Sequence, residues 1–185
     1  MDLSIEPLSA AAFAPFGQVI EVSDMARHFT INAGFAERYH DLARVDVASA
    51  GGRPQISIFR ARPRSLPMAL SLLERHPLGS QAFMPLSQLP YLVVVAPPAD
   101  ASRPDLARLR CFAVGPGQGV NYAAGTWHHP LLALQAECDF LVVDRGGAAS
   151  DHNCDEFALD GLGLWLAVGP NTPVSLSSQS VAQIF

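Results

Sequence analysis

The stretch of sequence at residues 115–134 reads GPGQGVNYAAGTWHHPLLAL and carries four glycines and two adjacent histidines. Because glycine and proline interrupt regular structure, its first half is typical of a turn-rich loop. Its last residues, Leu131–Leu134, form an apolar run that indicates a buried strand. Successive side chains of a strand point to opposite faces. We therefore expect one of His128 and His129 to face inward and the other to face outward.

A second stretch at residues 72–86 reads LLERHPLGSQAFMPL and has a similar character. Its His76–Pro77 pair stands beside a carboxylate, Glu74, and an amide, Gln81. Glu74 and His76 are two residues apart, so on a strand they share a face. Pro77 and Gly79 predict a turn, after which residues 81–86 are expected to pair back as a strand. We interpret the two stretches as the walls of one site.

The composition is that of a globular domain. The chain has 185 residues, of which 49% are hydrophobic and 16% charged, and its length allows one domain with a sizeable core. A net charge of −5 and a pI near 5.6 provide no basic surface, so no nucleic-acid partner is expected.

The sequence also bears on the cellular compartment of the protein. Its longest apolar run, residues 92–98, is far shorter than the roughly 20 residues of a membrane span, so no membrane association is expected. The first residues, MDLSIEPLSA, lack the basic and apolar segments of a signal peptide. The three cysteines are odd in number and show no CxxC spacing, which favours a reducing compartment and no structural zinc. We expect a cytoplasmic protein.

Short strands separated by turn signals dominate the rest of the chain. Ser9 is expected to cap a short helix over residues 10–13. The expected strands span residues 18–22, 55–60, 70–76, 81–86, 91–96, 109–114 and 140–144. This pattern predicts a mainly all-β fold, an antiparallel sandwich or barrel with few helices.

The polar segment at residues 30–44 allows two interpretations. It places Asn32, Arg38, Tyr39 and His40 close together. It is either a solvated loop or half-helix, or a segment that lays polar groups over the mouth of a pocket.

Several long motifs in a fixed order make the sequence similar to the ureidoglycolate lyase family, from about residue 5 to about residue 160. They are PLSAAAFAPFGQVIE, INAGFAERYHDLA, ERHPLGSQAFMPL, GQGVNYAAGTWHHPL, DFLVVDR and NCDE. The resemblance implies a double-stranded β-helix, the cupin-type jelly-roll barrel, usually as a homodimer. It implies a single catalytic domain over residues 1–160, with residues 161–185 as a C-terminal extension. It also implies cleavage of (S)-ureidoglycolate to glyoxylate and urea, a step of allantoin degradation in purine metabolism.

The spacing of Gly117, Gly125 and His128 fits the second cupin motif, in which seven residues separate the glycines and two precede the histidine. In the first motif, Glu74 and His76 stand in the places of paired histidines, and Gln81 in that of a glutamate. The equivalent metal ligands are therefore Glu74, His76, Gln81 and His128. The resemblance suggests a divalent metal, nickel, although a glutamine amide is a poor ligand for a transition metal.

The chemistry of the implied substrate suggests roles for further residues. One carbon of ureidoglycolate carries a hydroxyl, a carboxylate and a ureido nitrogen, so cleavage needs a base, an acid and a cation. Histidine can act as acid or base near neutral pH, and we expect His76 and His128 to be catalytic. An arginine fork suits the carboxylate, for which Arg38 and Arg60 are the candidates. The expected hydrogen-bonding residues for the substrate are Gln81, Asn121 and Asn32.

Two other functions fit the same fold. One is a ureidoglycolate amidohydrolase that releases ammonia and carbon dioxide, which would require a water aimed at the ureido carbonyl. The other is a non-catalytic cupin that binds a small molecule. Fold alone does not separate these functions, because function resides in the site.

Overall fold

The computed structural model describes residues 2–148 and 150–167. The helices are short: α1 (Ala10–Phe13), η1 (Asn32–Gly34), η2 (Ser49–Gly51) and η3 (Leu106–Arg108). The strands are β1 (Asp2–Leu3), β2 (Ile5–Pro7), β3 (Gly17–Ile20), β4 (His28–Ile31), β5 (Ala36–Tyr39), β6 (Arg53–Ala61), β7 (Met68–Ala69), β8 (Leu72–Arg75), β9 (Gln81–Pro85), β10 (Tyr91–Ala96), β11 (Arg110–Val114), β12 (Gly119–Tyr122), β13 (Trp127–His128), β14 (Leu132–Ala133), β15 (Cys138–Gly146), β16 (Asp155–Ala158) and β17 (Trp165–Leu166).

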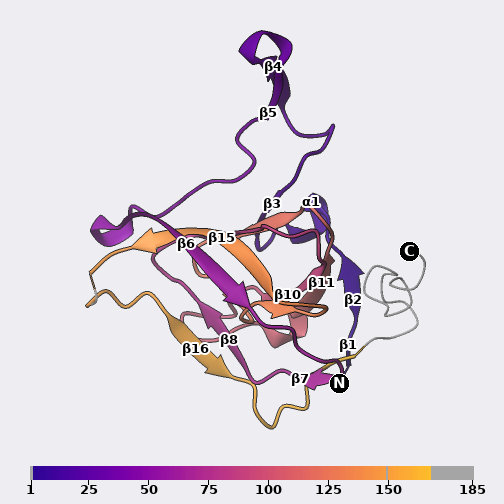
Figure 1. Cartoon of the computed structure of the whole chain (residues 1–185). Coiled ribbons are helices and arrows are strands. Elements are labelled where there is room, and N and C mark those ends of the chain that lie inside the picture. The colour runs from indigo at the N-terminus through magenta and orange to yellow at the C-terminus, as the bar shows by residue number, and fades with distance from the viewer. Residues whose placement is uncertain (1, 149, 168–185) are drawn as a thin grey trace, which may run out of the picture.

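Two sheets face each other to form the barrel (Figure 1). The first is seven-stranded, in the order β16-β8-β13-β10-β11-β2, with β14 also paired to β10. The second is five-stranded, in the order β3-β12-β9-β15-β6, which leaves β6 at an edge. The predicted mainly all-β fold of cupin type is confirmed, and the predicted cap of α1 is present, because Ser9 Oγ accepts a hydrogen bond from the Ala12 amide.

Strand β10 is buried on both faces of the seven-stranded sheet, which explains its unbroken apolar run. Tyr91, Val93 and Val95 join the core between the two sheets, together with Phe83, Phe112 and Phe140. Leu92, Val94 and Ala96 join a second core on the opposite face, together with residues of β1 and β17. A strand covered on both faces has no need of polar alternation.

One predicted pairing is wrong. Residues 81–86 do not pair back on residues 70–76: β8 pairs with β13 and β16, whereas β9 pairs with β12 and β15. The turn at Pro77 therefore carries the chain from one sheet to the other. This crossing places Glu74 and Gln81 on opposite walls of the barrel interior.

Residues 22–40 form an arm that projects from the barrel (Figure 1). Within it β4 and β5 pair only with each other and are joined by η1. The segment at 30–44, for which the sequence left open a solvated loop or half-helix and a cover of polar groups over a pocket mouth, thus lies partly in a β-hairpin. Its contact with a pocket mouth stays a prediction. Its internal contacts include the stacked rings of His28 and Tyr39.

The predicted division between a domain at 1–160 and an extension at 161–185 stays a prediction. In the described part of the extension, β17 pairs with β1 and β7. Residues 168–185 lie outside the described residues, and so does any role of their own. Among the described residues, no helix has the length and apolar character needed to cross a membrane.

Candidate active site

Three side chains from the two predicted stretches meet inside the barrel. One ligand atom each from Glu74 (β8), His76 (just after β8) and His128 (β13) lie within 4.8 Å of one another. Strand pairing places Glu74 directly opposite His128. The rings of His76 and His128 are 5.3 Å apart between centroids. The expected convergence of the two histidines is therefore present in the structure.

Backbone carbonyls fix the orientation of both imidazoles. Nδ1 of His76 lies 2.8 Å from the Asn153 carbonyl, and Nδ1 of His128 lies 3.0 Å from the Thr126 carbonyl. Because a carbonyl oxygen only accepts, each Nδ1 carries the hydrogen and donates it. In the neutral rings both Nε2 atoms therefore hold a free lone pair. Both are buried without a hydrogen-bond partner among the described residues.

The carboxylate of Glu74 determines the charge of the cluster. Its Oε1 lies 3.5 Å from His128 Nε2, longer than a normal hydrogen bond. Two lone pairs facing each other at this distance call for a proton or a cation between them. Interaction with His128 lowers the pKa of Glu74, which keeps it ionised. Burial, followed by the charge of His128, lowers the pKa of His76 and favours its neutral form.

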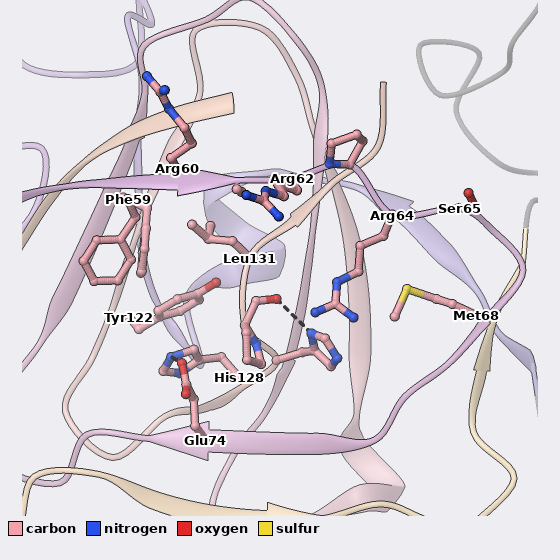
Figure 2. Close-up of a pocket in the computed structure, with 15 residues that line it drawn as sticks. Phe59, Arg60, Arg62, Arg64, Ser65, Met68, Glu74, Tyr122, His128 and Leu131 are labelled. Carbon is pink, nitrogen blue, oxygen red and sulfur yellow. Dashed lines mark hydrogen bonds and ion pairs between the residues drawn. The ribbon is translucent and has the colours of Figure 1, made fainter. Parts of the chain in front are cut away.

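The cluster adjoins a cavity of about 810 Å³, which Figure 2 shows, although His76 is not among the residues that line it. Glu74 and His128 line its floor, and Tyr122 and Phe83 line one side. The ring of Tyr122 stacks on His128, with centroids 4.2 Å apart and planes 15° from parallel. This stacking holds the imidazole in place and excludes water from one of its faces.

Asn121 lies on the other face of β12 from Tyr122. Its amide donates to Gln18 Oε1 at 2.7 Å and to the Arg44 carbonyl at 3.1 Å, and the side chain is buried there. The structure therefore does not bring Asn121 to the histidines. The side chain that the register of β12 turns toward them is Tyr122.

Gln81 does face the barrel interior. It is the residue of β9 that pairs directly with Tyr122 of the adjacent strand β12. Its Nε2 donates to Asp144 Oδ2 at 3.3 Å, and its Oε1 is buried without a hydrogen-bond partner among the described residues. Asp144 is a site residue that sequence reasoning did not assign. Its charge acts on His76, and its Oδ1 is buried and similarly unpaired. The sequence feature that could have identified Asp144 is its position on β15, two residues from Val142, because residues two apart on a strand share a face and Val142 faces inward.

The arginine side chains differ in direction. Arg60 turns its guanidinium away from the pocket, whereas Arg62 and Arg64 turn theirs toward it (Figure 2). The fork of Arg60 donates to both oxygens of Asp139, at 2.7 and 2.8 Å. This outward direction follows from the register, in which Arg60 pairs with Asp139 on the outer face of the sheet. Arg62 and Arg64, which both line the cavity, were not identified from the sequence.

Two further predicted residues lie on the arm. Asn32 is in η1 and Arg38 is in β5, where its guanidinium lies 5.8 Å from the centre of the Phe29 ring. Neither lines the cavity of its own chain. Their contact with substrate stays a prediction.

His129 was expected to face away from its neighbour, yet both histidines are buried and line the cavity. Strand β13 ends at His128, so strict alternation does not extend to His129. Nδ1 of His129 bonds the Pro130 carbonyl at 2.8 Å, and burial lowers its pKa. It lies outside the three-residue cluster.

Comparison with known proteins gives a consistent result. A family model described as ureidoglycolate lyase matches residues 1–165. A protein named ureidoglycolate lyase from Burkholderia mallei is 56% identical over 151 residues, which cover 82% of this chain and 86% of the relative. One of the same name from Azotobacter vinelandii is 54% identical over 154 residues, or 83% of this chain and 90% of the relative. Among solved structures, a dTDP sugar isomerase from Desulfovibrio desulfuricans aligns with a TM-score of 0.47 and 16% identity, over 80% of this chain and 88% of that one.

Proposed function

The chain belongs to the ureidoglycolate lyase family, and we propose that it cleaves (S)-ureidoglycolate to glyoxylate and urea. The observation that best supports this activity is a pair of imidazoles, His128 buried and His76 half-buried, whose Nε2 atoms lack a hydrogen-bond partner among the described residues and lie beside an ionised carboxylate. One neutral and one protonated imidazole provide the base and the acid that the reaction needs.

In the proposed reaction, His76 acts as the base and His128 as the acid. Nε2 of His76 accepts the proton of the substrate hydroxyl, because its lowered pKa keeps it neutral. The oxygen electron pair forms the carbonyl of glyoxylate as the carbon–nitrogen bond breaks. Nε2 of His128, whose proton faces Glu74, donates that proton to the departing urea nitrogen. Tyr122 keeps the acid in position through the stacked rings.

As an alternative to this metal-free acid–base pair, because it would occupy the same two Nε2 atoms, the cluster fits the divalent metal that the resemblance implies, nickel. Two imidazole nitrogens and a carboxylate oxygen suit such an ion, and both nitrogens lack a hydrogen-bond partner among the described residues. Glu74, His76 and His128 would hold it, with the Gln81 amide as a weaker fourth ligand. When bound, the metal supplies Lewis-acid polarisation of a substrate oxygen.

We further propose that the protein is cytoplasmic and acts as a homodimer on this small-molecule substrate. Its lack of paired cysteines supports the compartment, since Cys111, Cys138 and Cys154 are all free.

Product analysis tests the reaction. We expect the purified protein to convert one enantiomer of racemic ureidoglycolate to equimolar glyoxylate and urea, with no ammonia in the absence of urease. Chiral separation of the remaining substrate should show that half of the racemate is untouched. Ammonia as the nitrogen product would instead identify the amidohydrolase, and binding without turnover would identify a binding protein.

The position of Arg64 leads to a second prediction, on the cation that holds the substrate carboxylate. Arg64→Lys should raise KM about tenfold with little change in kcat, because lysine keeps the charge but loses the two-pronged geometry. Arg60→Lys is the matched control, since the Arg60 guanidinium points away from the cavity. If KM rose in Arg60→Lys and not in Arg64→Lys, the residue that binds the substrate carboxylate would be Arg60, as the sequence suggested.

A further inference from the structure

The NCDE motif at residues 153–156 has no part in the proposed reaction, yet the structure places it beside the cluster inside the barrel. Its last residues begin β16, which pairs with β8, the strand that carries Glu74. The register sets Asp155 opposite Arg75, the residue before His76. The residues just before β16 therefore pass the end of β8, where His76 follows the strand.

Asn153 holds the turn that follows β8 at both of its ends. Its backbone carbonyl accepts a hydrogen bond from Nδ1 of His76 at 2.8 Å. Its side-chain Oδ1 accepts a hydrogen bond from the Leu78 amide at 2.9 Å. Because β8 ends at Arg75, strand pairing does not fix the direction of the His76 side chain. Among the described residues, Asn153 therefore provides the one hydrogen bond that orients the His76 ring.

The segment that carries Asn153 is anchored on both sides by ion pairs to arginines of the barrel. Two residues before it, Asp151 Oδ2 lies 2.8 Å from the guanidinium of Arg145 on β15, whose side chain is 1% exposed. Two residues after it, Asp155 Oδ2 lies 2.7 Å from the guanidinium of Arg75 on β8, whose side chain is 11% exposed. Short charge-assisted hydrogen bonds to a buried guanidinium hold a carboxylate in a defined geometry. Asn153 is thus held between two fixed points.

The Asn153 carbonyl determines which nitrogen of His76 is available for chemistry. A carbonyl oxygen only accepts, so it keeps the hydrogen of the neutral ring on Nδ1 and leaves the lone pair on Nε2. Nε2 is the atom that the proposed reaction uses as the base. Without the carbonyl, the ring would be free to turn and to carry its hydrogen on either nitrogen.

We propose that Asn153 is a positioning residue for His76. Its side chain fixes the turn through the Leu78 amide, and this bond keeps its own carbonyl on the His76 ring. The effect on turnover rests on the proposed function, in which His76 is the base, whereas the orientation of the ring does not. The same hydrogen on Nδ1 is required if Nε2 holds a metal instead.

Steady-state kinetics measure the positioning. Asn153→Ala removes the acceptor of the Leu78 amide, and we expect kcat to fall about tenfold or more with KM within about threefold, because a displaced base slows proton transfer without weakening binding. Asn153→Asp keeps an oxygen at the same position and should restore kcat to within about threefold of the wild type. Asp105→Ala is the matched control, since Asp105 Oδ1 accepts the Ala107 amide at 3.2 Å away from the cavity, and it should leave kcat unchanged.

Nitrogen-15 NMR of the imidazoles tests the same role in the resting protein, without substrate. The resonances of His76 are assigned by their absence from a His76→Ala variant. At about pH 8 the ring is neutral, and we expect a slowly exchanging hydrogen on its Nδ1 in the wild type, in Asn153→Asp and in Asp105→Ala. In Asn153→Ala this signal should be lost, because the exposed hydrogen exchanges rapidly with water.

The two measurements together separate positioning from a general structural role. A wild-type protein without the protected Nδ1 hydrogen would overturn the proposal, whatever the variants show. So would a folded Asn153→Ala variant that keeps this hydrogen, with or without loss of turnover, or an equal loss of kcat in Asn153→Asp. If the wild type carries the hydrogen but does not cleave ureidoglycolate, the proposed function fails and the orientation of His76 by Asn153 stands.

Discussion

His128→Ala is expected to lower kcat by at least about two orders of magnitude, the scale of a positioned acid or base. The substitution removes the Nε2 atom that faces Glu74 and the ring that stacks on Tyr122. It also leaves the Glu74 carboxylate without the imidazole that faces it at 3.5 Å. The measurement is steady-state turnover of ureidoglycolate, on protein whose thermal melt shows that it is folded.

His129→Ala is the control at the adjacent position. His129 is as buried as His128 and lines the same cavity, but it lies outside the cluster. We expect its kcat to stay within about tenfold of the wild type, with the larger effect on stability. Assays with and without a chelator separate lost proton transfer from lost metal. An inactive His129→Ala beside a nearly normal His128→Ala would refute the assigned roles.

Local signals in the sequence were enough to predict much of the fold. The cap at Ser9 depends on a hydroxyl and an amide three residues apart, and it is present. The strand at residues 91–96 was predicted with its exact bounds, because six apolar residues between turn signals leave few alternatives. The two histidine-containing stretches were expected to form one site, and Glu74, His76 and His128 do meet.

The sequence could not predict the features that depend on which face of a strand is covered. Ile56, Ile58 and Arg60 share a face of β6 by simple alternation, and apolar side chains usually mark the core face. Here that face is the outer one, so Arg60 points away from the pocket and Phe59 lines it. For the same reason, the sequence could not show that Tyr122, and not Asn121, faces the histidines. A sheet with apolar residues on both faces removes the signal that alternation normally provides.

Gly17→Ala is expected to destabilise the fold by about 3 kcal/mol or more, since overpacking at a rigid site adds to backbone strain. Gly17 pairs with Tyr122 at the start of β3, and its φ is +150°. A methyl group there would overlap the carbonyl oxygen of Asn121, which belongs to the backbone of β12 and is not free to move aside.

The Gly125→Ala variant separates the cost of backbone strain at a positive φ from the cost of steric overlap by the added methyl group. Gly125 has a φ of +79°, yet a methyl group at this position meets no atom within 4 Å. The substitution should therefore lower the free energy of unfolding only through backbone strain, by about 1 kcal/mol. Thermal melts at matched protein concentration should show Gly17→Ala lowered by roughly 10 °C and Gly125→Ala by roughly 3 °C.

The activity of Gly17→Ala links this packing to the chemistry. Relief of the overlap requires β12 to shift, and β12 carries Tyr122, whose ring holds His128 in place. At a temperature where the variant is folded, kcat should fall about tenfold or more, because small displacements of catalytic groups are costly. Equal melting temperatures for the two glycine variants would show that β12 yields freely at Gly17. Wild-type turnover in a destabilised Gly17→Ala would show that His128 keeps its position without the support of β12.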